Sequence, residues 1–95
     1  MKTKVDEVRI IPINPIKSPH HNDVLVALAT CIIDSKFFVG SIGVYQRDDG
    51  GYRITYPTKR RERSELKLFC PLNVETGQDI EDAIVGEYLK LYVEE

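Results

Sequence analysis

The residues best suited to chemistry in this 95-residue chain are four cations that lie close together past its middle. Residues 58–63 read TKRRER and supply Lys59, Arg60, Arg61 and Arg63. Guanidinium groups bind phosphate oxygens in pairs and keep their charge at any working pH. Such a segment can follow a phosphate backbone without reading bases. A solvated surface run with no partner has the same composition, so composition alone leaves both interpretations open.

The other candidate groups form no catalytic or metal-binding pattern. His20 and His21 are adjacent, and adjacent side chains in a strand or loop point apart, whereas a metal needs three or four convergent ligands. Residues 48–51 (DDGG) lack the ligand spacing of a calcium loop and indicate a hairpin turn. Neither a GxSxG nor a GxxxxGK motif occurs. We therefore predict no enzyme, no metal, no cofactor and no small-molecule substrate.

Length and composition indicate one small globular domain over residues 1–95. Hydrophobic residues make up 42% of the chain, which is enough for a thin core. No run approaches the ~18 apolar residues of a membrane span, and the first residues lack the apolar stretch of a secretory signal. We expect a cytoplasmic protein without a membrane partner. Cys31 and Cys70 lie in apolar runs and are predicted to be buried free thiols.

The charges are distributed unevenly, although the formal net charge is only −2. Residues 53–67 hold six cations against two carboxylates, whereas residues 68–95 hold one cation against seven carboxylates. This asymmetry can steer a polyanion to one face of the protein. It can equally pair the acidic end of one subunit with the basic segment of its neighbour.

Alternating apolar residues predict short strands, separated by turns rich in Gly, Asp and Pro. The strands are expected at residues 4–13 (ending at Pro12), 24–33, 37–45, 52–56 and 66–70, with a loop over 14–23. The run 24–33 could also be a short helix, but the turn that follows it favours a hairpin. In 52–56, Tyr52, Ile54 and Tyr56 share one face, which either joins the core or stacks on unpaired bases.

The period changes from 2 to 3.6 at Thr76, which predicts a C-terminal helix. Its apolar face would hold Ile80, Ala83, Ile84, Tyr88 and Leu91. Thr76 with Asp79 three residues later resembles a capping box, and the carboxylates Glu81, Asp82 and Glu87 suit solvation or capping better than acid–base chemistry. The expected fold is therefore α+β: an antiparallel sheet of about five strands with the helix packed on one face.

The order of several short motifs resembles that of the SpoVG family. Residues 29–39 (ATCIIDSKFFV) are similar to its hairpin of alanine, apolar strand, Asp, two residues and Phe-Val. Residues 56–60 (YPTKR) resemble its Met-Pro-Ser-Lys-Arg stretch, and 69–73 (FCPLN) stand where it has apolar-His-Pro-Ile-Asn. Residues 80–88 (IEDAIVGEY) resemble its helix, with Ile-x-x-Ala-Val followed by Glu-Tyr. The resemblance extends over residues 5–92.

This resemblance implies a small dimeric bacterial regulator of sporulation and of the division septum that binds DNA and RNA. Lys59 and Arg60 match the family's Lys-Arg pair, and Arg61 and Arg63 add charge where the family has a Gly-bearing turn. The chain departs from the family at residues 76–79 (TGQD), where cations tied to nucleic-acid contact are replaced by an acidic helix start. The loop 14–23 also looks inserted.

Two functions therefore remain open at the level of sequence. The first is a homodimeric, non-enzymatic nucleic-acid-binding regulator that contacts phosphates through Lys59, Arg60, Arg61 and Arg63. The second is a protein-interaction module of the division or sporulation machinery with little affinity for nucleic acid. The acidic end of the chain fits self-association or partner docking better than it fits DNA.

Overall fold

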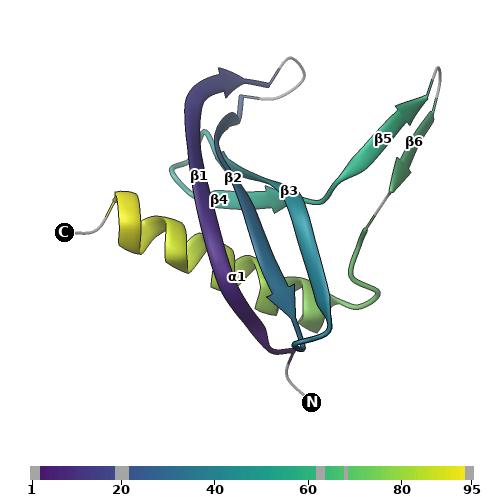
Figure 1. The fold of residues 1–95 in the computed structure, drawn as a ribbon. Helices are drawn as coiled ribbons and strands as arrows, with labels where there is room; N and C mark the ends of the chain where they lie inside the picture. Colours follow the sequence, from purple (N-terminus) through teal and green to yellow (C-terminus); the bar gives the residue numbers. More distant parts are fainter. Residues whose placement is uncertain (1–2, 19–21, 62–63, 68, 94–95) are drawn as a thin grey trace.

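Antiparallel pairing between neighbouring strands produces most of the architecture of this computed structural model, which describes residues 3–18, 22–61, 64–67 and 69–93. Within these residues a four-stranded sheet has the order β1-β2-β3-β4, and a helix packs on one of its faces (Figure 1). A separate two-stranded sheet pairs β5 with β6. The elements are β1 (Val5–Lys17), β2 (Val24–Ile33), β3 (Phe37–Gln46), β4 (Tyr52–Thr55), β5 (Thr58–Arg61), β6 (Ser64–Lys67) and α1 (Val74–Tyr92).

Both predicted tight turns of the main sheet are present. Asp34 and Ser35 join β2 to β3 with φ of 52° and 57°, and the Lys36 N–H donates to the Ile33 carbonyl at 2.9 Å. Between β3 and β4, Gly50 adopts a φ of 92°, which a glycine tolerates without steric cost. The run Val24–Ile33 is a central strand, paired on both sides, as the turn that follows it favoured.

The sheet's inner face carries the core, because alternate residues of the central strands are small or branched and point toward α1. The helix contributes two fully buried isoleucines, Ile80 and Ile84. Opposite them lie Ala27, Ala29, Cys31, Ile33, Val39, Ile42 and Val44. The small residues of β2 and the branched residues of β3 fill this core together with the two isoleucines of the helix.

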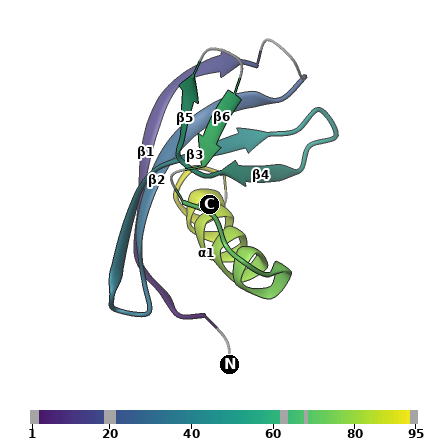
Figure 2. The same cartoon turned by 90° about the vertical axis from the view of Figure 1, so that its right-hand side faces the viewer.

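Two bulges bend the sheet at the same level of β2. One interrupts the β1 register between Asp6 and Arg9, and the other interrupts β3 where the β2 register shifts between Ala29 and Cys31. Glu7 and Ser41, at these bulges, have positive φ values of 48° and 55°. Because a bulge increases local twist and bend, the sheet coils around α1 (Figure 2).

The opposite side of the sheet, which we call the outer face, bears side chains from register partners that point away from α1. Ile11 pairs with Leu28, and Ile32 pairs with Phe38. The Phe38 ring lies over Gly40, and the Tyr45 ring lies over Gly43. Figure 1 looks onto this face with α1 behind it, and Figure 2 shows the helix on the other side only. The side chains of the described residues leave Ile11, Ile16 and Phe38 exposed there.

The helix begins earlier than its hydrophobic period indicated. Asn73 is the N-cap, and its side-chain oxygen accepts a hydrogen bond from the Thr76 N–H at 2.8 Å. The predicted capping box of Thr76 and Asp79 is therefore wrong. Those two side chains instead hold the N-terminal segment: Asp79 accepts from the Thr3 N–H at 3.0 Å, and the Thr3 hydroxyl lies 3.2 Å from the Thr76 hydroxyl.

The predicted fold class is confirmed, but two predicted strands have wrong bounds. β1 continues through Pro12 and Pro15 to Lys17, because it is an edge strand and an edge strand tolerates a missing N–H. The strand predicted at residues 66–70 is instead Ser64–Lys67, and it pairs with β5 rather than with the main sheet. Of the two cysteines expected to be buried, Cys31 is buried and Cys70 is exposed.

We predict that adding one methyl group at Gly43 destabilises the fold. A Cβ there would lie 2.7 Å from the Thr55 hydroxyl and 3.1 Å from the Tyr45 ring. Gly43→Ala should lower the free energy of unfolding by about 1–3 kcal/mol, as overpacking does. Gly86→Ala is the matched control, because nothing lies within 4 Å of its Cβ position. It should raise stability by about 1 kcal/mol through helix propensity. Urea unfolding checks both, and equal effects would contradict the assigned packing.

Candidate nucleic-acid interface

The cation-rich residues 58–61 form a strand that pairs in a hairpin. Lys59, Arg60 and Arg61 belong to β5, which pairs antiparallel with β6. Arg60 is the register partner of Glu65, and Arg61 is that of Ser64. Arg63 lies outside the described residues. The structure therefore brings Lys59, Arg60 and Arg61 together on one four-residue strand, although no strand was predicted there.

This basic hairpin, β5 and β6 together, projects from the body of the molecule. Figure 1 shows β5 and β6 extending past β3 and β4 and away from α1. Its two strands share a sheet only with each other. Local patterns in the sequence do not predict this hairpin, because β5 forms by pairing with β6, which lies further along the chain.

An aromatic pair anchors the base of the basic hairpin. Tyr56 precedes β5 and Phe69 follows β6, and their ring centroids lie 5.5 Å apart at an interplanar angle of 50°. Both residues pack against the core cluster. Tilted aromatic pairs at this distance contribute about 0.5–1.5 kcal/mol beyond the area they bury. The segments that lead into and out of the hairpin are therefore both held against the core.

The hydroxyl group of Tyr56 is buried and has no hydrogen-bond partner among the described residues. Burial above all, together with the charges of Glu81 and Cys31, raises the pKa of Tyr56 to about 12. Leaving a buried hydroxyl unpaired is unfavourable. The ring of Tyr56, rather than its hydroxyl, therefore accounts for the stabilising contact at this site.

The tyrosines of residues 52–56 face the core. Of the two alternatives that the sequence left open, the structure therefore supports a role in the core and not stacking on bases. Tyr52 and Tyr56 pack against the core cluster together with Ile54. The Tyr52 ring also lies 5.5 Å from the ring of Tyr88 on α1. Because these rings are engaged inside the domain, they do not form an outward platform for unpaired bases.

Arg53, on β4, is the first cation of residues 53–67, and it is already paired within the domain. Its Nε donates to the Asp23 carboxylate at 2.5 Å, and its guanidinium carbon lies 4.4 Å from the centroid of the Tyr45 ring. The Arg53 and Asp23 side chains are 26% and 17% exposed. Arg53 therefore holds the end of the loop before β2 against β4. No local spacing in the sequence predicted this pair, because 30 residues separate its members.

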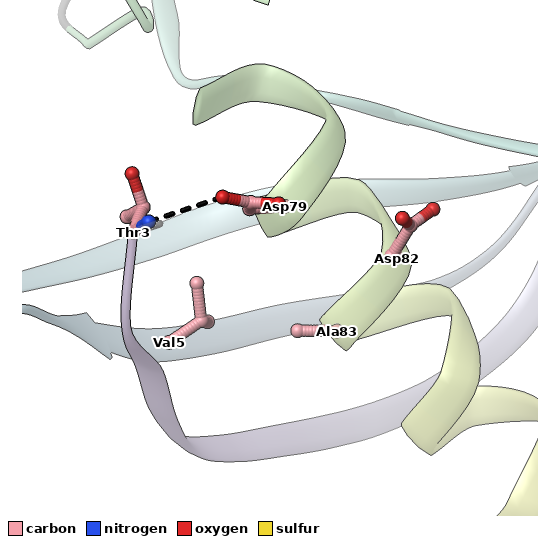
Figure 3. A pocket seen from close by; sticks show the side chains of 5 residues that line it. All are labelled: Thr3, Val5, Asp79, Asp82 and Ala83. Carbon is pink, nitrogen blue, oxygen red and sulfur yellow. Dashed lines mark hydrogen bonds between the residues drawn. The ribbon is translucent and has the colours of Figure 1, made fainter. Parts of the chain in front are cut away.

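The acidic start of α1 is partly occupied by contacts within the chain. Figure 3 shows Asp79 turned toward the backbone of Thr3 above a shallow pocket of about 320 Å³ that Val5, Asp82 and Ala83 also line. Asp82 accepts a hydrogen bond from the Gln78 amide at 2.7 Å. In the part of the chain that the structure describes, no three His, Cys, Asp or Glu residues gather as a metal site. His20 and His21 lie outside that part.

These features define a class of protein: a small two-layer α+β domain that carries a projecting basic hairpin. No family model matches the sequence. The chain is 34% identical to the SpoVG septation protein of Anaeromyxobacter sp. (strain Fw109-5), over 90% of this chain and 80% of that protein. It is 33% identical to the SpoVG septation protein of Bdellovibrio bacteriovorus, over 92% of this chain and 74% of that protein.

A third relative, the SpoVG septation protein of Anaeromyxobacter sp. (strain K), is 31% identical over 90% of this chain and 77% of its own length. The chain belongs to the SpoVG family, as a divergent member. None of these three relatives is named as an enzyme. Among the described residues, α1 is too polar to cross a lipid bilayer.

We predict that Tyr56 is the last tyrosine to ionise in the folded protein. Its folded pKa of about 12 lies above the ordinary value of 10.0, so the unfolded state loses this proton first. The free energy of unfolding should therefore fall as pH rises from about 10 to 12. In Tyr56→Phe this fall should be shallower, and the last step in phenolate absorbance should disappear.

Tyr88→Phe is the control for this titration, because burial also raises the pKa of Tyr88. That variant should keep the late phenolate step near pH 12. If Tyr56→Phe left the late step unchanged, the assignment of the buried hydroxyl to Tyr56 would be wrong.

Proposed function

We propose that this protein is a non-enzymatic regulator that binds nucleic acid, DNA or RNA, through the basic hairpin. In this proposal it acts in the cytoplasm, in septum formation and the sporulation-linked control of division. The septation names of its relatives support the cellular setting. The observation that carries the proposal is the concentration of Lys59, Arg60 and Arg61 on one strand of a hairpin that projects from the domain.

The physical argument rests on shape and charge together. A two-stranded ribbon fits the major groove of DNA, which is about 12 Å wide. Cations on such a ribbon contact phosphate oxygens, and these contacts position the protein without reading sequence. β5 and β6 project away from α1 in Figure 1, so a polyanion can reach β5 without meeting the carboxylates of the helix. Arg63, next to the strand in sequence, adds a fourth cation to this segment.

The proposal includes a homodimer, because two copies present two hairpins to one polyanion. Four cations from each copy would make eight phosphate contacts. The logarithm of the association constant should then fall with the logarithm of salt concentration at a slope of about −7 on duplex DNA. A single hairpin would give about half that slope.

Charge reversal on the hairpin tests the proposal. Arg60→Glu together with Arg61→Glu should weaken binding to labelled single-stranded RNA, single-stranded DNA and duplex DNA by at least about 100-fold at low salt, because the salt-dependent term would be lost. Fluorescence anisotropy measures the affinity. Lys36→Glu with Lys90→Glu is the matched control, since it changes the net charge equally at two exposed positions outside the hairpin. That control should bind nearly as the parent does.

Two results would reject the proposal: unchanged affinity in the hairpin variant, or an equal loss in the matched control. Far-UV circular dichroism of each variant separates loss of binding from loss of fold. The titration should run from low to physiological salt, because an affinity measured at one salt concentration cannot separate phosphate contacts from other contacts.

A second candidate function is a protein-interaction module of the division or sporulation machinery. The acidic surface of α1 favours it, because Glu75 and Asp82 are exposed there and would repel a phosphate backbone. In that case the basic hairpin would meet an acidic protein surface. Recovery of a defined protein partner after nuclease treatment, with no salt-dependent binding to nucleic acid, would support this function over the first.

A further inference from the structure

The outer face of the main sheet carries an exposed aromatic ring. Phe38 of β3 is 71% exposed, and it points outward because its neighbour Val39 is buried in the core. A Cβ at Gly40 would lie 3.4 Å from Cε1 and 3.8 Å from Cζ of this ring, and 3.8 Å from the methyl group of Thr30. The ring therefore leans over Gly40 by one edge, and most of its surface is open to solvent.

An exposed cation, Arg9 of β1, stands on the same face. Thr30 points outward because Ala29 and Cys31, on either side of it, are buried in the core. Arg9 is the register partner of Thr30 and therefore points outward as well. The order across the sheet is thus Arg9, Thr30 and then Gly40 with the ring above it. Because β1 and β3 are two strand spacings apart, roughly 10 Å separates the cation from the ring.

The positive charge of Arg9 is available to a ligand. Two carboxylates near this face are already compensated, because Asp6 lies 3.2 Å from the Lys4 ammonium and Asp23 is bonded to Arg53. Arg9 belongs to neither of these ion pairs and has no other among the described residues. A wholly apolar partner would bury its guanidinium without a counter-charge, which is unfavourable. The face therefore suits a ligand that brings both negative charge and apolar surface.

An unpaired nucleotide has both of these properties. Every base has an apolar π-face that stacks on an aromatic ring, and the phosphates of the strand bind guanidinium groups. In a duplex each base is covered on both faces by its neighbours, so a ring on a sheet reaches only the bases of a single strand. The ring and the cation together therefore distinguish single strands from duplexes, which phosphate contacts by themselves do not.

We infer that the outer face of the sheet binds single-stranded nucleic acid, with a base stacked on Phe38 and a phosphate on Arg9. This inference rests on the proposed function and adds contacts to unpaired bases to the phosphate contacts of the basic hairpin. One strand can meet both surfaces. Thr55, near the base of the hairpin, pairs with Gly43, which lies roughly 17 Å along β3 from Phe38. A duplex, in contrast, would contact the hairpin alone.

Two neighbouring phenylalanines supply a matched pair of variants. Phe37 is 61% exposed, but it pairs in register with the buried Ile33 and so lies toward the inner side at the end of the sheet. Phe38→Ala should weaken binding to a labelled, unstructured single-stranded RNA of about 12 nucleotides by roughly 5- to 100-fold, because one stacked base is lost. Its affinity for duplex DNA should not change. Phe37→Ala should bind both as the parent does, and Phe38→Tyr should keep the affinity for RNA. Fluorescence anisotropy measures each affinity.

The salt dependence separates the role of the cation from that of the ring. In Arg9→Gln, the slope of the logarithm of the association constant against the logarithm of salt concentration should become shallower by about 0.7 on single-stranded RNA, the amount for one phosphate contact. Phe38→Ala should keep the parent's slope, because stacking releases no counterion. Lys90→Gln, which removes an exposed cation of α1, is the control and should also keep that slope. Far-UV circular dichroism should be the same for all variants, since the substituted side chains are exposed.

Four results would overturn the inference. They are unchanged RNA binding in Phe38→Ala, an equal loss in Phe37→Ala, an equal loss on duplex DNA and single-stranded RNA in Phe38→Ala, and a change of sedimentation mass in Phe38→Ala, which would assign the ring to a protein contact. The hairpin is tested separately by Arg60→Glu with Arg61→Glu on duplex DNA, which does not need the ring. A loss on duplex DNA in that variant, with RNA binding unchanged in Phe38→Ala, would keep the proposed function and reject this inference.

Discussion

The core between α1 and the inner face of the main sheet is the contact on which the rest of the structure depends. Ile80 and Ile84 are fully buried against Ala27, Ala29 and Cys31, and these side chains exclude water from the middle of the domain. A 95-residue chain has one such core and no second one to replace it. Replacing either isoleucine by alanine would remove roughly 2–5 kcal/mol from a total that is usually about 5–15 kcal/mol. Two of the four register shifts of the main sheet lie at the level of this contact, where the sheet curves around the helix.

One-sided packing has a consequence for function, because a sheet covered on a single face leaves the other face to solvent or to a partner. The same helix that completes the core therefore leaves Ile11 and Phe38 exposed. The basic hairpin is separate from both faces and is joined to the core by the Tyr56–Phe69 pair. The domain thus divides into a packed inner face, an apolar outer face and a charged projection. Each of these surfaces has a different chemistry.

Much of this arrangement was readable from local patterns. The turns at residues 34–36 and 47–51 and the central strands follow from short-range alternation and turn chemistry. That Tyr52, Ile54 and Tyr56 share one face follows in the same way, but only the structure shows that this face joins the core. The ends of the strands and of the helix were less predictable. The helix begins at Val74 because Asn73 caps it, while Thr76 and Asp79 hold Thr3, a partner more than 70 residues away in sequence. A capping pattern and a long-range contact use the same residue types, and only the fold distinguishes them.

The sequence by itself determined the fold class, the concentration of positive charge in residues 58–63 and the acidic character of the C-terminal helix, because these depend on residue type and on spacing over one or two turns. Tertiary structure alone decided that the cations lie on a paired hairpin, that Arg53 is engaged with Asp23, and that Cys31 is buried while Cys70 is exposed. It also decided which apolar residues face α1 and which face outward. The physical reason is that strand pairing and bulges determine where a side chain points, and both depend on partners distant in the chain.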